Sequence, residues 1–236
     1  MTNSLIIIAG LLPVIVLFIY ICKKDPQPEP TKQLIKAVLY GIVITIPIVF
    51  FEQIVQSFLF GSGGPYTLLG TTIEAFFAAA LPEESFKLLA LWLILRHNPY
   101  FDEHFDGIVY AVCIGLGFAG IENIFYLFSN LDSWLSVAIS RALLAVPGHY
   151  AFAVIMGYYY SKHHFIDHSS RTAIYTLLIP ILAHGIYDAL ALSGTIDPYV
   201  GGICALVLIY FCIKMHKFAN KKIIAQLERD KNESIT

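Results

Sequence analysis

The sequence predicts an all-α fold, a polytopic membrane helix bundle of about seven transmembrane helices. Of the 236 residues, 57% are hydrophobic and only 14% are charged, whereas soluble domains carry about 25% charged residues. Seven apolar stretches are long enough for a helix to cross a bilayer. The alternating short segments of a closed membrane barrel are not visible, so the stretches are predicted to be helices.

The predicted spans are separated by short connections that contain helix-breaking residues. Prolines 26, 28 and 30 follow the first span, and a glycine-rich turn at 61–66 follows the second. The first span has no basic residue before it and no small-residue cleavage site after it, which favours a retained span over a signal peptide. The chain is expected to form one transmembrane bundle over 1–216, in which 67–193 contains the helices of the candidate site, and a cytoplasmic tail over 217–236 that forms a frayed amphipathic helix. The spans are 4–22, 36–60, 67–96, 105–128, 134–160, 171–193 and 198–216.

Basic residues predict the orientation of the bundle. Thirteen of the fifteen lysines and arginines fall in or beside the connections after spans one, three and five, or after the last span. The turns at 61–66, 129–133 and 193–197 contain none. Because basic residues stay in the cytoplasm, this segregation predicts an N-out, C-in topology in a bacterial cytoplasmic membrane. The net charge of −2 gives no basic field for nucleic acid, so the expected surroundings are the lipid bilayer.

The third span cannot turn all its faces to lipid. Thirteen Leu, Ile and Phe residues in 68–95 contribute roughly −4 to −8 kcal/mol to insertion. Glu83, Glu84 and Lys87, if charged, cost about 8–10 kcal/mol in total. This helix must therefore present its polar face to partners or to water inside the bundle. Pro82, immediately before the two glutamates, is expected to kink it.

Lys87 lies one helical turn after both glutamates, at i+4 from Glu83 and i+3 from Glu84. It is expected to bond one of them while the other points about 100° away, and the three groups should titrate as a coupled set. A single ion pair would suffice to lock helix packing. Two glutamates, with further titratable groups in other spans, favour a site of chemistry or transport.

The following three spans carry the remaining candidates. Span four contains Gly115 and Gly117, which should let a neighbouring helix approach closely beside Glu122. Span five carries Arg141 and, after a Pro-Gly pair, His149. In span six His184 and Asp188 share one helix face. The aspartate is expected to hold one ring N–H and to orient the other nitrogen toward a metal, a water or an oxyanion.

This ordered set resembles the PrsW family of bacterial intramembrane proteases. The pattern E-E-x-x-K, F-x-x-x-E-N, H and H-x-x-x-D lies on successive spans and covers about half the chain. The layout is also similar to that of the CAAX prenyl endopeptidases, although Lys87 stands where those relatives have arginine and Glu122 where they have histidine. The resemblance implies a membrane endopeptidase, whose partner is a membrane-anchored substrate such as an anti-sigma factor, cut near the outer face. The relatives favour Glu83 over Glu84 as the base.

Two hydrolytic mechanisms are compatible with these residues. In the first, Glu122, His149 and His184 bind Zn²⁺ and leave an open position for water, which Glu83 or Glu84 activates. In the second there is no metal, Glu83 activates water directly, and His184 with Asp188 steadies the oxyanion. The carboxylate and two histidines match known catalytic zinc sets, which favours the first.

Two other functions are compatible with the residues alone. Buried glutamates, histidines and a lysine also form the relays of proton- or ion-coupled transporters. The same polar groups could serve only to hold the helices of a structural membrane subunit together. The resemblance favours the protease over both.

Overall fold

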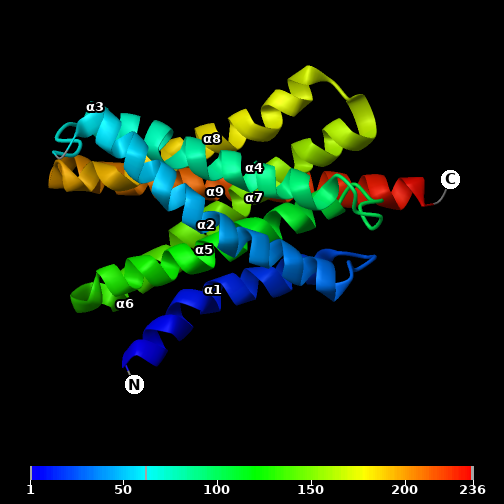
Figure 1. Cartoon of the computed structure of the whole chain (residues 1–236), viewed down its shortest axis with the longest axis horizontal. Helices are drawn as coiled ribbons and strands as arrows, with labels where there is room; N and C mark the ends of the chain where they lie inside the picture. The colour runs from blue at the N-terminus through cyan, green and yellow to red at the C-terminus, as the bar shows by residue number, and fades with distance from the viewer. Residues whose placement is uncertain (1, 62, 235–236) are drawn as a thin grey trace.

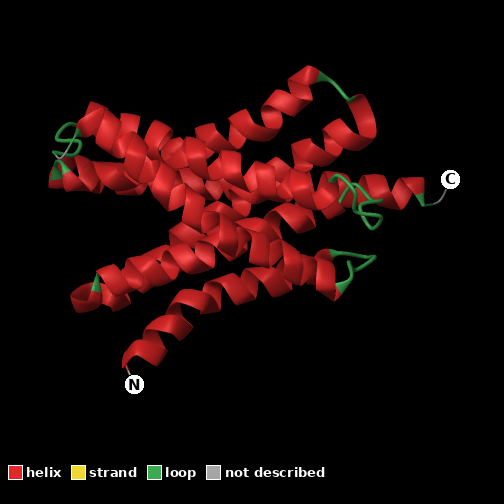
Figure 2. Ribbon diagram, viewed as in Figure 1, coloured by secondary structure: helices red, strands yellow, loops and turns green. Residues whose placement is uncertain are grey.

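The protein folds as the predicted bundle of helices. The computed structural model describes residues 2–61 and 63–234, and this part of the chain is almost entirely helical and contains no strand (Figure 2). Residue 1 of the predicted bundle, residue 62 of the glycine-rich turn and residues 235 and 236 of the predicted tail lie outside the described residues. The all-α prediction is therefore confirmed. The helical elements, shown in Figure 1, are α1 (Thr2–Lys24), α2 (Thr31–Phe60), α3 (Leu68–Ile73), η1 (Glu74–Ala80), α4 (Leu81–Leu95), α5 (Asp106–Ser129), η2 (Leu131–Ser133), α6 (Trp134–Ser140), η3 (Arg141–Ala145), α7 (Val146–Lys162), η4 (His163–Asp167), α8 (Ser170–Leu192), η5 (Ser193–Thr195) and α9 (Pro198–Glu233).

Six helical stretches in the described chain are long and apolar enough to cross a membrane, which confirms a polytopic membrane protein. The predicted span 67–96 is not among them, although α3, η1 and α4 form one continuous helical run there. Its glutamates and lysine make it too polar, so its membrane crossing stays a prediction. The six are Asn3–Lys24, Thr31–Phe60, Asp106–Ser129, Leu131–Asp167, Ser170–Thr195 and Pro198–Glu233.

The end of the chain forms an amphipathic helix as predicted from residue 217 onward, but this helix is docked on the bundle and not frayed. Helix α9 continues through 217 to Glu233, and Ala219, Ile223 and Gln226 on one face of it are buried. One turn further on, the Asp230 carboxylate accepts hydrogen bonds from the backbone N–H groups of residues 104 and 105, at 2.7 and 2.9 Å. A spacing of four, three and four residues places these side chains on one stripe, which docks the helix.

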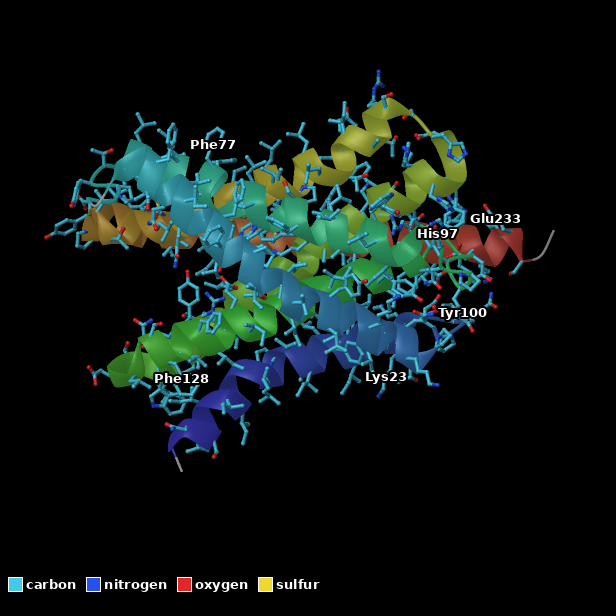
Figure 3. The ribbon with its side chains drawn as sticks, viewed as in Figure 1. Lys23, Phe77, His97, Tyr100, Phe128 and Glu233 are labelled. Carbon is cyan, nitrogen blue, oxygen red and sulfur yellow. The ribbon has the colours of Figure 1, made fainter. Side chains whose placement is uncertain are left out.

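The connections that carry the basic residues meet at one end of the bundle. The Gln27 side chain donates a hydrogen bond to Glu103, and the rings of Phe101 and Phe165 pack with centroids 4.8 Å apart. Figure 3 shows Lys23, His97, Tyr100 and Glu233 gathered at this end. The arrangement agrees with the predicted segregation of charge.

Helix α5 is the centre of the bundle, and α1, α2 and α7 pack around it. The close approach of α2 requires two glycines. A Cβ atom at Gly117 would collide with the backbone of Val38, and one at Gly41 would collide with the carbonyl of Ile114. The expectation that small residues in this span bring a neighbouring helix close is confirmed at Gly117.

Two of the helical runs widen into a π-helix just before a proline. η1 precedes Leu81-Pro82, and η3 precedes Val146-Pro147. A proline in a helix has no N–H to donate and its ring collides with the carbonyl four residues earlier, so a wider turn relieves the collision. The candidate catalytic glutamates and His149 follow these prolines by one or two residues.

The docking of α9 should depend on pH through Glu103. Burial and the nearby carboxylates of Asp230, Asp25 and Asp102 together raise the pKa of Glu103 from its usual 4.5 to about 7. The folded protein therefore holds this proton more tightly than the unfolded chain does. The resulting stabilisation is complete below about pH 4.5 and is lost as the pH rises to about 7.

We therefore expect amide exchange in residues 219–233, corrected for its intrinsic pH dependence, to be faster at about pH 8 than at about pH 5. Glu103→Gln should remove most of this difference because a neutral amide replaces the titrating group. Glu228→Gln, at an exposed position of the same helix, should leave it intact. An equal pH response in the Glu103→Gln and Glu228→Gln variants would contradict the assignment.

Candidate active site

Helix α4 contributes a buried cluster of three charged side chains. The Lys87 ammonium lies 2.8 Å from Glu83 Oε2 and 2.9 Å from Glu84 Oε1. The three residues are only 4%, 4% and 0% exposed. Lys87 thus pairs with both glutamates, whereas the sequence predicts a bond to one. The flexible lysine side chain reaches between the i−3 and i−4 positions, so a 100° separation around the helix does not keep the carboxylates apart.

His149 on α7 joins this cluster to α5. Its Nδ1 lies 3.3 Å from the Lys87 ammonium, and its Nε2 lies 2.8 Å from Glu122 Oε2. Since an ammonium only donates, Nδ1 accepts there, and the Nε2–H donates to Glu122. The imidazole is therefore neutral in this arrangement, as a metal ligand must be.

Helix α8 supplies His184 and Asp188 one turn apart, as the sequence predicts. His184 Nε2 lies 3.2 Å from Asp188 Oδ2, and Nδ1 lies 2.9 Å from Glu84 Oε1. Both nitrogens face carboxylates, so the ring donates on both sides as an imidazolium unless one carboxyl carries the proton. The Asp188 contact fixes the ring and aims Nδ1 at the glutamates.

Glu122 belongs to α5 and contacts Arg141 on η3. Its Oε2 accepts a hydrogen bond from Arg141 Nη2 at 2.6 Å, and Arg141 Nε donates to Asn123 Oδ1 at 2.5 Å. The Asn123 amide in turn donates to the Gly10 carbonyl at 3.0 Å. Arg141 is thereby the counter-ion of Glu122.

These groups surround a cavity of about 380 Å³. Helix α2, η1, α5, η3 and α8 form its walls, and Glu83, His149 and His184 lie among its lining residues, whereas Glu84 does not. The lining extends to residues such as Gln56 and Leu192, which lie close to the turns at 61–67 and 193–197. In Figure 1 the ends of α5 and α6 diverge from α3, α8 and α9 on this side of the bundle. The cavity therefore runs from the charged cluster toward the predicted outer end.

One group of side chains in the described chain has the composition and spacing of a catalytic metal site. Donor atoms of Glu83, Glu84, His149 and His184 all lie within 4.8 Å of one another. The Glu84 Oε2 atom is buried and has no hydrogen-bond partner among the described residues, so it is left for a metal or a water. Carboxylate oxygen and imidazole nitrogen are ligands that Zn²⁺ accepts. Glu122, the predicted third ligand, is not a member of this group.

Two aromatic side chains contact the charged cluster, and the sequence analysis assigned a role to neither. The Lys87 ammonium lies 4.2 Å from the centroid of the Phe118 ring, and Phe152 stacks on His184 with centroids 4.8 Å apart. Phe118 stands one turn before Glu122, and Phe152 stands three residues after His149. Helical spacing from each polar residue would have indicated both aromatic side chains.

The family model that matches residues 29–215 is described as PrsW family intramembrane metalloprotease. The chain belongs to the PrsW family. The match covers most of the bundle, including every helix that contributes to the charged cluster.

Curated relatives match this chain over most of their own length. Protease PrsW of Geobacillus kaustophilus is 35% identical over 91% of this chain and 92% of its own. The protein of the same name from Clostridioides difficile is 37% identical over 76% of each chain, and that from Bacillus subtilis is 36% identical over 78% and 81%. No solved structure matches this chain.

Membership of the PrsW family makes this chain an intramembrane protease and a multi-pass cell-membrane protein. The resemblance stated on the motif residues is thereby confirmed. The comparisons favour the peptidase over the transporter and the structural subunit that the polar residues alone would allow. They name no substrate for this chain and no particular metal.

Removal of the lysine should destabilise the whole bundle. Lys87→Met leaves two buried carboxylates without their cation, and breaking a buried ion pair in this way costs about 3–5 kcal/mol. We expect a large fall in the midpoint of thermal unfolding in detergent. Lys162→Met is the matched control, because Lys162 is more exposed and its nearest carboxylate lies 3.9 Å away. Such surface pairs contribute about 0–1 kcal/mol, so similar midpoints for the two variants would contradict a structural role of the cluster.

Proposed function

We propose that the protein hydrolyses a peptide bond of a membrane-anchored protein inside the cavity, with Glu83 as the general base. The observation that carries this assignment is the difference between the two adjacent glutamates. Glu83 lines the cavity, whereas Glu84 is wholly buried and is held by Lys87 and His184. A base must reach the water that it activates, which favours Glu83.

The neighbouring groups have supporting roles in this proposal. Lys87 holds both carboxylates in place, with its ammonium 2.8 Å from Glu83 Oε2 and 2.9 Å from Glu84 Oε1. Asp188 orients the His184 ring, and the Nδ1–H of that ring, which donates to Glu84 in this structure, would have to shift to the oxygen of the reacting carbonyl. Glu83 accepts a proton from water as the water attacks the scissile carbonyl, His184 donates to the developing oxyanion, and Glu83 returns the proton to the leaving amine.

We further propose that the metal of this family is Zn²⁺ in this chain. His149 and His184 are ligands in either of two possible sets, completed by Glu122 as the sequence suggests or by Glu84 with its unpartnered oxygen. Bound Zn²⁺ would lower the pKa of a water and polarise the scissile carbonyl. The Lys87 ammonium stands within 3.3 Å of donor atoms on three members of the four-residue group, so it must move aside if a metal takes that position. The metal-free mechanism needs no such movement.

The proposed substrate is a single-pass membrane protein, such as an anti-sigma factor, cut near the outer face of the membrane. The extension of the cavity toward the turns at 61–67 and 193–197 supports this position. An extended segment beside the spanning helix could enter there without the whole helix having to unwind.

Substitution of the proposed base should abolish cleavage without unfolding the protein. Glu83→Gln keeps the size of the side chain and a hydrogen bond to Lys87 but cannot take a proton. Removal of a general base costs about 10²–10⁴-fold in rate, measured as the rate of cleavage of a co-expressed single-pass reporter. Correct insertion and an unchanged thermal midpoint serve as the folding control. Cleavage at the wild-type rate by Glu83→Gln would remove the assignment.

Metal content should separate the two mechanisms and the two ligand sets. We expect about one zinc per wild-type molecule by elemental analysis after purification in detergent, and loss of zinc in His149→Ala and His184→Ala. Loss in Glu122→Gln with retention in Glu84→Gln would identify the ligand set that the sequence suggests, and the reverse result would identify the other. Fully active protein without zinc would end the zinc proposal.

A further inference from the structure

The outer part of the cavity contains two carboxylates that the proposed mechanism does not use. Glu52 on α2 and Glu74 at the start of η1 both line it. Glu74 accepts a hydrogen bond from the neutral amide of Gln56 at 2.6 Å. Glu52 is half-buried and has no hydrogen-bond or ion-pair partner among the described residues. Neither carboxylate belongs to the motif that identifies the family.

The charges of the described lining residues do not balance. Five carboxylates line the cavity, at Glu52, Glu74, Glu83, Glu122 and Asp188, and the only lysine or arginine among the described lining residues is Arg141. Arg141 is engaged by Glu122, Glu83 is paired with Lys87, and Asp188 contacts His184. The lining carboxyl groups that have no cation within ion-pair distance among the described residues are therefore Glu52 and Glu74.

An ionised carboxylate without a cation is costly at membrane depth, because little water is available to solvate it, so such a group keeps its proton until a cation arrives. A cation supplied by a ligand in the same cavity would offset this cost. The protease acts on polypeptides, and the cations that a polypeptide can bring are lysine and arginine side chains. Glu52 and Glu74 lie between the catalytic cluster and the outer opening, where an incoming substrate segment must pass.

The distances along the helices define where the cation would lie. Glu74 precedes Glu83 by nine residues on one continuous helical run, which corresponds to about 13 Å at the helical rise. An extended peptide covers this distance in about four residues. Glu52 lies one turn deeper than Gln56, the partner of Glu74, and so would contact a position nearer the scissile bond.

We propose that Glu52 and Glu74 are specificity-determining residues that select a lysine or arginine located about two to four residues on the outer side of the cleaved bond. The inference rests on the proposed proteolytic function and adds the chemical class of the substrate. It does not depend on which mechanism activates the water.

The test uses the full-length protein co-expressed with a library of single-pass reporters. Six consecutive residues at the outer end of the reporter's membrane span are randomised, and the cleaved and intact pools are sequenced. We expect lysine and arginine to be enriched at least fivefold in the cleaved pool of the wild type, at positions on the outer side of the cut. Glu52→Gln with Glu74→Gln should reduce the enrichment to below twofold while the cleavage of reporters without a basic residue stays the same.

Charge reversal distinguishes a direct contact from a structural effect. Glu52→Lys should shift the preference toward aspartate and glutamate, and Glu52→Asp should retain the wild-type preference. Asp132→Asn is the matched control, because Asp132 is exposed at the same end of the bundle and does not line the cavity.

Failure of the inference and failure of the proposed catalytic assignment give different experimental results. Cleavage by the wild type without a charge preference, or a preference that survives the double Glu→Gln variant and Glu52→Lys, overturns the inference and leaves the proteolytic function standing. If the wild type cleaves no reporter, or cleaves no faster than Glu83→Gln, the proposed catalytic assignment fails, and the inference fails with it.

Discussion

The burial of the Lys87 ammonium between Glu83 and Glu84 is the interaction on which the site depends. A charge of either sign is expensive at membrane depth, and two adjacent carboxylates would repel each other without a cation between them. Lys87 lies within 3 Å of both and against the face of Phe118. The same contact holds α4 against α5, because Phe118 belongs to α5, and against α7 through His149. The geometry of the candidate site and the packing of these helices therefore depend on the same contacts.

The π-helical segments η1 and η3 help to position the side chains of this cluster. Each lies just before a proline, and each proline is followed within two residues by a member of the site. A regular helix would direct one side chain every 100° around a straight axis, which gives little choice of where the side chains of different helices meet. A wider turn changes the phase of the residues that follow it. The Leu81-Pro82 and Val146-Pro147 breaks thus help to aim the glutamates and His149 at one cavity. This agrees with the frequent occurrence of such turns at functional sites.

The all-α membrane bundle and the candidate site residues could be predicted from the sequence because both produce local signals of large free energy. Apolar length defines the spans, and ionisable residues within them have few places to go except toward one another. The contacts within the site are harder to foresee. Lys87 bonds both glutamates, although their separation around the helix suggested only one, because the lysine side chain is long enough to compensate. Helix α9 is docked and not frayed beyond 216 because its buried stripe contacts the connection at 104–105, and a partner so distant in the sequence cannot be read from the tail itself.

Glu122 is paired with a different cation from the one that pairs with Glu83 and Glu84. The residue type suggested a metal ligand, and the structure surrounds it with Arg141 and the Nε2–H of His149. Those two contacts already satisfy the oxygen that faces the cluster, whereas Glu84, wholly buried, retains an oxygen without a partner. A cation added to the site would therefore gain more from Glu84 than from Glu122, unless Arg141 turned away at the same time. The ligand set is thus coupled to the position of an arginine on η3, a helical segment whose π geometry already departs from the regular hydrogen-bonding pattern. Any movement of η3 that accompanies substrate entry would change the electrostatics at the catalytic cluster, because the arginine that it carries is the principal counter-ion of Glu122.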